Sequence, residues 1–304
     1  MGVNPFLIMG QAGIERAAEQ HGARTLVLES EDPTTRDENV RAAIAEGAEL
    51  VLVLGFEFGD IIPRAARAHP EVEFLIADQC IDDLPENVHC AVFKEYESAF
   101  LIGAAAASLS KTRHVGVIGA LDIPFLHRYT EGFTLGAQHV DPEIRVSILW
   151  VGGESPFSDP VRAKEQALAM AASGADYILS AAAAGNFGIF EAAQEQGFGT
   201  FGIDVNQCPS APEVVFENMI KRVDVAIGEA IEAILAGQPG QIHQYGLAQR
   251  GVGLVTLTSD RPQDSQCRIL EHPELLDQLR DLEHRIIGGE ISIRDPMFTQ
   301  GRGD

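Results

Sequence analysis

Basic side chains are scarce in this chain of 304 residues, since 22 Lys and Arg stand against 45 Asp and Glu. The resulting formal charge of −23 at pH 7 repels phosphate backbones and anionic lipid headgroups, so we expect no nucleic-acid partner. No run of about 18 consecutive apolar residues occurs, and the sequence therefore predicts no membrane-spanning helix.

Motifs for metal binding and catalysis are also missing. The four cysteines (Cys80, Cys90, Cys208 and Cys267) form no CxxC pair, and no histidine stands at zinc-ligand spacing beside them. Cys80 and Cys90 are able to bridge, but we expect buried free thiols. There is no GxSxG, HExxH or Walker loop, and GVIGA at 116–120 has too few glycines for a dinucleotide site. We therefore expect no metal, no cofactor and no enzymatic activity.

What the chain does contain is a series of short apolar strands that alternate with helical stretches. The predicted strands are 24–28, 49–54, 72–77, 88–93, 115–118, 144–151, 177–180 and 200–203. Alternation of this kind is typical of βαβ units and a parallel sheet. Two such series, separated by a long Ala-rich helix over 97–109, predict two similar α/β lobes.

The first series opens on a helix over 11–21, whereas a doubly wound lobe should begin with a strand. We therefore expect a first strand upstream of Met1, or one that has been lost. The first residues also lack the basic and apolar regions of a secretion signal. The protein is then either cytosolic, or numbered from a point after a removed signal.

Candidate ligand-binding residues lie just beyond predicted strands, where open parallel sheets bind their ligands. The stretch 114–128 has this form, and so do Asp78, Gly185 and Asp204. Carboxylates at such positions can accept hydrogen bonds from paired hydroxyls of the kind that a sugar presents. The alternatives are a helix N-cap for Asp204 and an ordinary polar loop for Asp78.

Aromatic residues in predicted loops form a second set of candidates. Phe6, Phe56, Phe157 and Phe187 lie outside the predicted strands. Exposed rings of this kind can stack on a base, or they can anchor their loops in the core. Lys221, just before a predicted helix, is unremarkable if it is a solvated surface charge.

Several blocks resemble, in order, those of the basic membrane protein family of PnrA-like substrate-binding lipoproteins of ABC importers. They are GFEFGD, FKEYESAFLIGAAAASLSKT, VGVIGALDIPFLHRYTEGFTLGAQ, GNFGIFEAAQEQG, GIDVNQ, MIKRVDVAI and GLAQRGVGL. The resemblance implies a type I periplasmic-binding-protein fold, with two doubly wound parallel-sheet lobes, a hinge and an interlobe cleft. We place the lobes at 1–93 plus 222–254 and at 94–221 plus 255–304.

The resemblance also implies a ligand and roles for individual residues. Members of this family typically bind purine nucleosides without altering them. Phe6 and Phe157 resemble the rings that sandwich the base, Asp204 and Lys221 the ribose-binding pair, and Gly185 a point of close ligand approach. Phe56 would line the pocket, and Asp78 falls where sugar-binding relatives place a carboxylate. At the start, NPFLIM stands where the family usually has Ser-Phe-Asn.

The sequence thus predicts a monomeric, periplasmic or membrane-anchored solute-binding protein that delivers a nucleoside or sugar-like ligand to an ABC permease. One alternative is an intracellular sensor or regulator on the same fold. A nucleoside-processing enzyme is another, although no DxD-type carboxylate cluster stands at a strand end.

Overall fold

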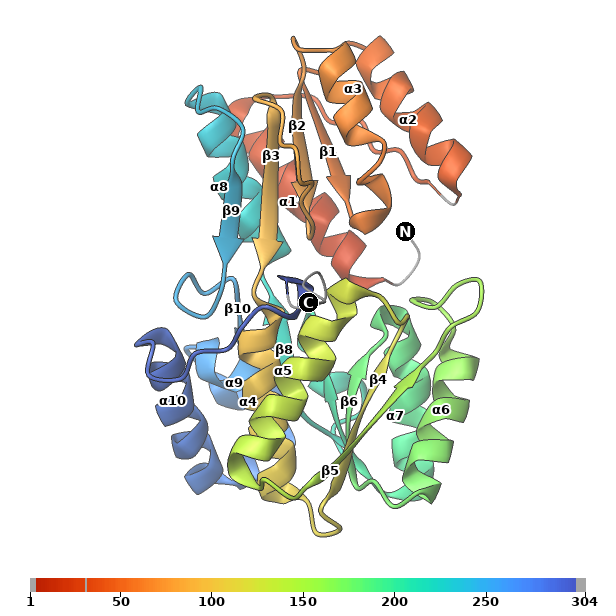
Figure 1. Cartoon of the computed structure of the whole chain (residues 1–304), viewed down its shortest axis with the longest axis vertical. Coiled ribbons are helices and arrows are strands. Elements are labelled where there is room, and N and C mark those ends of the chain that lie inside the picture. Colours follow the sequence, from red (N-terminus) through yellow and green to blue (C-terminus); the bar gives the residue numbers. More distant parts are fainter. Residues whose placement is uncertain (1–3, 31, 299–304) are drawn as a thin grey trace, which may run out of the picture. The chain divides into compact units, whose positions relative to one another are not determined.

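The computed structural model describes residues 4–30 and 32–298, which form two compact units. Of the described residues, unit 1 contains 6–30, 32–93 and 222–245, and unit 2 contains 4–5, 94–221 and 246–298. Beyond residue 6, the chain passes between the units at 93/94, 221/222 and 245/246. Each unit is an α/β structure with its own largely parallel sheet (Figure 1).

Unit 1 has a four-stranded sheet of order β1-β2-β3-β9, in which every pair is parallel. The strands are β1 (Leu50–Leu54), β2 (Glu73–Ala77), β3 (Val88–Phe93) and β9 (Ile242–Tyr245). The helices are α1 (Pro5–His21), α2 (Pro33–Ala45), α3 (Ile62–Ala68) and α8 (Val223–Leu235), with a 3-10 turn, η1 (Phe56–Phe58), after β1.

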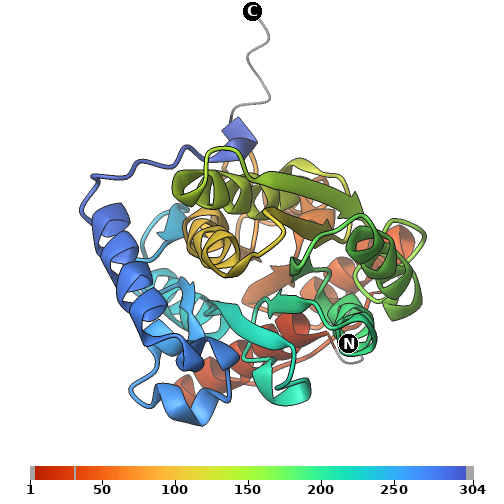
Figure 2. The ribbon, with the colours of Figure 1, turned by 90° about the horizontal axis from the view of Figure 1, so that it is seen from below.

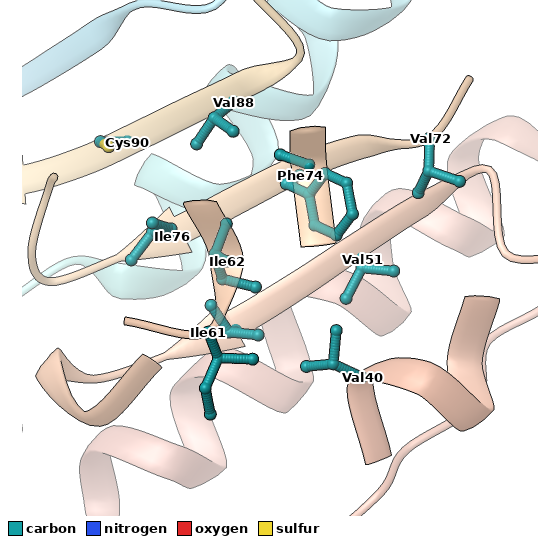
Figure 3. Packing of buried hydrophobic residues seen from close by; sticks show 11 residues of the cluster. Val40, Val51, Ile61, Ile62, Val72, Phe74, Ile76, Val88 and Cys90 are labelled. Carbon is teal, nitrogen blue, oxygen red and sulfur yellow. The ribbon is translucent and has the colours of Figure 1, made fainter. Parts of the chain in front are cut away.

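One apolar cluster joins this sheet to α2 and α3 (Figure 3). Its strand residues are every second one, as the alternation of side chains along a strand requires. The cluster contains Val40, Val51, Val53, Ile61, Ile62, Ala66, Val72, Phe74, Ile76, Val88 and Cys90. These residues form the face of the sheet that packs against α2 and α3, and the residues of the other face, such as Leu75, Ala91 and Phe93, are buried as well.

Unit 2 has a six-stranded sheet of order β10-β8-β7-β6-β4-β5, in which only the β10–β8 pair is antiparallel. Its strands are β4 (His114–Gly119), β5 (Arg145–Trp150), β6 (Tyr177–Ala181), β7 (Gly199–Gly202), β8 (Val215–Lys221) and β10 (Val252–Leu254). Its helices are α4 (Glu95–Leu109), α5 (Pro124–Val140), α6 (Pro160–Ala172), α7 (Asn186–Gln196), α9 (Val255–Thr258) and α10 (Pro273–Ile287).

Helices α4 and α5 lie side by side in unit 2 (Figure 2). A Cβ atom added at Gly103 would overlap the backbone of Phe133, and one added at Gly136 would overlap the backbone of Phe100. These glycines therefore let the two helix backbones approach closely. The chain after α10 returns to α5, against which the last 3-10 turn, η6 (Pro296–Phe298), packs.

The two units repeat the same series of elements. Helices α1 and α5 each have 17 residues and begin with Pro-Phe-Leu. Helices α2 and α6 each have 13 residues, begin with Pro and are capped by an Asp, Asp32 or Asp159. Each is followed, after residues 46–49 or 173–176, by a strand of 5 residues. Strands β1, β2 and β3 are therefore the counterparts of β6, β7 and β8, and they occur in the same sheet order.

The cysteines differ from our expectation of free thiols, which is wrong. Cys80 is bonded to Cys90 in unit 1, and Cys208 to Cys267 in unit 2. Strands β2 and β3 are neighbours, and so the loop after β2 brings Cys80 to within 5.3 Å of Cys90, measured between Cα atoms. The second bridge joins residues 59 apart, a pairing that spacing in the sequence does not reveal.

Two further expectations need correction. The predicted strand at 24–28 is not formed, and Leu26 within it is 57% exposed, because no described strand pairs with this segment. Residues 246–254, which we placed in the first lobe, group with unit 2 because β10 pairs with β8. Among the described helices, none is both long and apolar enough to cross a membrane.

Candidate functional site

The predicted ligand-binding residues fall into two groups, one in each unit, and most of them lie at or just beyond the carboxyl ends of parallel strands. Unit 1 holds Phe6, Phe56 and Asp78, and unit 2 holds Phe157, Gly185, Asp204 and Lys221.

In unit 2, Asp204 lies in a tight turn that follows β7. Its backbone has a φ of 70°, a conformation that is uncommon for any residue except glycine, and it is only 6% exposed. The Asp204 carbonyl accepts a hydrogen bond of 3.0 Å from the backbone N–H of Lys221 at the end of β8. This turn is not a helix N-cap, so the alternative that we considered for Asp204 is wrong.

The buried side-chain amides of Asn186 and Gln207 form hydrogen bonds that stabilise the same turn. The Asn186 carboxamide accepts from the backbone N–H of Ala182 at 2.9 Å and donates to Gln207 Oε1 at 3.0 Å. Gln207 Oε1 also accepts from the backbone N–H of Ile203, at 3.2 Å. Asn186 and Gln207 are buried, and Gln207 Nε2 has no hydrogen-bond partner among the described residues. The loops after β6 and β7 are thus held together, with an unmatched donor beside them.

Gly185 lies in the loop after β6 and Phe157 in the loop after β5, next to the hydrogen bonds of Asn186 and Gln207. Gly185 ends the 3-10 turn η2 (Ala183–Gly185) and is buried. The backbone N–H of Ala184 donates to the Phe157 carbonyl at 3.0 Å, which places the Phe157 turn beside η2. The Phe157 ring is half-buried in an irregular segment, as predicted for a loop aromatic. Phe187, by contrast, lies in the first turn of α7 rather than in a loop.

Lys221 is buried rather than solvated. It is 4% exposed, and its Nζ lies 2.8 Å from Glu95 Oε1. The ammonium also lies over two rings of α5, 5.1 Å from the centroid of Phe125 and 5.6 Å from that of Tyr129. Cation–π attraction of this kind is strongest where water is excluded.

The ion pair of Lys221 belongs to a larger buried cluster. Arg128 Nη1 lies 3.4 Å from Glu95 Oε2, and Arg128 also donates to both carboxylate oxygens of Asp295, at 2.9 and 2.6 Å. Two cations and two carboxylates leave the cluster with no net charge. Arg128 ends the stretch 114–128 that we singled out from the sequence, but the sequence indicates no individual role for Glu95, Arg128 or Asp295, because they come from α4, α5 and the C-terminal segment and share no motif.

Unit 1 presents a smaller group at the ends of β1 and β2. Asp78 follows β2 with a φ of 88° and is 8% exposed, so it is a buried carboxylate on a strained turn. The backbone N–H of Asp78 donates a hydrogen bond of 2.8 Å to the backbone carbonyl of Ala91 in β3. Burial raises the pKa of the neighbouring Glu57, and the negative charge of Asp78 adds to that rise.

The two candidate aromatic residues of unit 1, Phe6 and Phe56, each lie at the start of a helical element. Phe56 is half-buried and opens η1 directly after the strand. Phe6 is half-buried in the first turn of α1, and so the prediction of a loop position for it is wrong. Phe6 lies on the same face of α1 as Gly10, four residues further on. A Cβ atom added at Gly10 would overlap Leu54, so this face of α1 packs closely against the end of β1.

Asp78 and Asp204 occupy equivalent places in the repeat. Each follows the second strand of a matching pair, β2 or β7, and each has a left-handed backbone and a buried side chain. A non-glycine residue held in this conformation costs about 1–3 kcal/mol, and such residues concentrate at binding sites. The structure thus gives both carboxylates the same unusual setting, one in each unit.

A separate surface cavity of about 650 Å³ lies at the opposite ends of the unit 2 strands. Tyr177, Gly199 and Phe216, at or near the starts of β6, β7 and β8, line it together with Asp176 and Arg268. Its polar groups bond to the protein itself: Asp176 accepts from Ser110, and Arg268 donates to Glu213. We assign it no ligand. Within residues 4–30 and 32–298, no three His, Cys, Asp or Glu side chains form a group able to hold a metal.

Comparison with known proteins gives a consistent result. Residues 4–296 match the family described as ABC transporter substrate-binding protein PnrA-like. The chain is 27% identical over 254 residues to basic membrane protein A of Borreliella burgdorferi, covering 80% of this chain and 73% of that protein. It is 35% identical over 156 residues to the ABC transporter nucleoside-binding protein BmpA of Lactococcus lactis, covering 51% and 43% of the two chains.

Solved structures show the same fold. A solute-binding protein of an ABC transporter system from Aeropyrum pernix superposes with a TM-score of 0.83 at 24% identity, over 97% of this chain and 90% of that one. A transcriptional activator of the comK gene from Bacillus halodurans gives a TM-score of 0.74 at 20% identity, over 94% and 95% of the two chains. The predicted type I periplasmic-binding-protein fold is thereby confirmed.

Proposed function

The chain belongs to the PnrA-like family of ABC transporter substrate-binding proteins, and from this premise we propose that its ligand is a purine nucleoside or a closely related sugar-like molecule. A relative that is 35% identical over half of this chain carries the name of a nucleoside-binding protein, which supports the proposal. The protein binds the ligand without altering it and delivers it, as a monomer, to a membrane permease.

The observation that carries the proposal is the pair of buried carboxylates at equivalent strand ends, Asp78 and Asp204. Carboxylates at the ends of parallel strands can accept hydrogen bonds from the paired hydroxyls of a ribose or similar sugar. In this proposal Asp204 accepts from the ribose hydroxyls, and Asp78 contributes the second acidic group.

The remaining residues would bind the rest of the ligand. The rings of Phe6 and Phe157 stack on the base, Phe56 lines the pocket wall, and the backbone at Gly185 allows close approach. Each base stack is worth about 1–3 kcal/mol. These stacks and a few charge-assisted hydrogen bonds are enough for the roughly 8 kcal/mol that a micromolar dissociation constant requires.

Lys221 would act as a fixed donor. Its ammonium is held by Glu95 at 2.8 Å and by two rings of α5, so the group is oriented before a ligand arrives. Preorganisation of this kind lowers the entropy that binding must otherwise remove.

The two disulfides favour an extracytoplasmic protein over an intracellular sensor or regulator. Cys80–Cys90 and Cys208–Cys267 account for all four cysteines. Disulfides persist in oxidising compartments and are rare where thiols are kept reduced. We therefore propose that the protein works outside the cytoplasm, where a substrate-binding protein meets its permease.

A thermal-shift screen tests this function. Purine nucleosides should raise the melting temperature, because a ligand at a hundred times its dissociation constant stabilises by about 2.7 kcal/mol. Free bases and free ribose, which each lack half of the contacts, should have smaller effects. Release of free base during incubation would instead indicate a nucleoside-processing enzyme. A screen in which no nucleoside shifts the transition would refute the proposed ligand class.

A further inference from the structure

The C-terminal segment of unit 2 brings a carboxylate into the cluster that holds Lys221. After α10 the chain returns to α5, against which η6 packs (Figure 2). Asp295 stands directly before η6, and its Oδ1 accepts a hydrogen bond of 3.1 Å from the backbone N–H of Met297. The turn thus fixes the Asp295 carboxylate beside α5.

Arg128 of α5 bonds more strongly to Asp295 than to Glu95. The Arg128 guanidinium donates to both Asp295 carboxylate oxygens, at 2.9 and 2.6 Å, whereas its Nη1 lies 3.4 Å from Glu95 Oε2. Short, bidentate bonds between arginine and a carboxylate are the stronger kind. The other oxygen of Glu95 consequently stays close to the Lys221 ammonium, at 2.8 Å.

Glu95 therefore lies between two cations that compete for it. The side chains of Glu95, Arg128 and Lys221 are all buried, and charges interact strongly where water is excluded. Arg128 also lies next to Tyr129 on α5, whose ring the Lys221 ammonium contacts at 5.6 Å. If the charge of Arg128 were not neutralised, it would draw Glu95 away from Lys221 and would repel the ammonium.

We propose that Asp295 is a positioning residue for ligand binding. By neutralising Arg128, Asp295 keeps Glu95 on Lys221 and so holds the ammonium where the ligand meets it. This role rests on the proposed function, in which Lys221 is a fixed donor to the ribose. It makes the C-terminal segment part of the binding machinery, although that segment supplies none of the candidate ligand contacts.

Asp295→Asn tests this role, because it removes the charge and keeps the size of the side chain. Affinities for adenosine, guanosine and inosine are measured by isothermal titration calorimetry. The variant should bind about tenfold more weakly than the parent, since a hydrogen bond to a charged group is disturbed. The matched control is Asp277→Asn, an exposed carboxylate that bonds to Arg280 at 2.7 Å, and it should leave the affinities unchanged. Unchanged affinity in a folded Asp295→Asn variant would overturn the proposal.

A second substitution separates positioning from a general loss of structure. Adding Arg128→Met to Asp295→Asn removes the cation that has lost its carboxylate, so Glu95 should return to Lys221 and the affinity of the parent should be recovered. Replacing both members of a buried ion pair is often tolerated, and the double variant therefore remains informative even if the single variant does not fold. A folded double variant that binds tenfold more weakly than the parent, about as expected for the single variant, would overturn the proposal.

The Lys221 ammonium itself supplies a test that needs no ligand. Its N–H protons, buried and bonded to Glu95, should exchange slowly enough to give a signal in ¹H–¹⁵N NMR spectra of the parent. The signal should be lost in Asp295→Asn and regained in the double variant. A signal that is absent from the parent, or that persists in Asp295→Asn, would overturn the proposal. Failure of the proposed function would instead appear as a parent protein that binds no nucleoside.

Discussion

Replacing Asp204 with Asn isolates the charge that we assign to ribose binding. Asparagine keeps the size of the side chain and tolerates the left-handed backbone, where φ is 70°. A hydrogen bond to a charged group is worth about 1.5–3 kcal/mol. Loss of that charge should therefore weaken nucleoside binding by about 10- to 150-fold, measured by isothermal titration calorimetry.

The matched control is Asp260→Asn, an exposed carboxylate in the same unit. It should leave the dissociation constant unchanged, and both variants should melt within a few degrees of the unaltered protein. If Asp204→Asn binds nucleoside as tightly as the parent while remaining folded, the assignment of Asp204 to the ligand is wrong.

Three further predictions concern stability in the absence of ligand. Glu95→Gln leaves the buried Lys221 ammonium without its carboxylate, and urea denaturation should show that the free energy of unfolding falls by about 3–5 kcal/mol. Adding Lys221→Met to this variant should restore part of that loss. Additive losses in the double variant would contradict the pairing. Burial raises the pKa of Glu217 to about 7, from the usual 4.5. The contribution of this carboxyl to the free energy of unfolding is therefore fully present below pH 4.5, and it is lost as the pH rises through about 7. Between about pH 5 and pH 8, the free energy of unfolding should therefore fall less for Glu217→Gln than for the parent protein. Curves of unfolding free energy against pH that run parallel for the two proteins would refute this. The disulfide between Cys208 and Cys267 spans 59 residues, so replacing both with Ser should cost about 4 kcal/mol in denaturant unfolding, and no change in the midpoint would argue against it.

The sequence predicts most of the fold because strand and helix periodicities are local. Strand β3 begins and ends at the predicted residues, 88 and 93, and α10 covers most of the predicted helix from Pro273. The segment 24–28 has the composition of a strand but forms none, since a strand exists only with a partner and the partner is not encoded locally.

The candidate site is only partly predictable. Asp78 and Asp204 are detectable because they follow apolar strands, and this position requires no knowledge of tertiary contacts. Glu95 and Asp295 are not detectable, because they join the cluster only after α4, α5 and the C-terminal segment have packed. The bridge partner of Cys208, which is 59 residues away in the sequence, is not detectable for the same reason.

The central claim is that this protein binds an intact nucleoside and performs no chemistry on it. Calorimetric titration of the full chain with adenosine, guanosine and inosine, followed by chromatography of the mixtures, tests it most directly. We predict one site of micromolar or tighter affinity for at least one of them, equivalent to about 8 kcal/mol or more, with the nucleoside recovered unchanged. No heat of binding with any of the three, or recovery of free base, would contradict the claim.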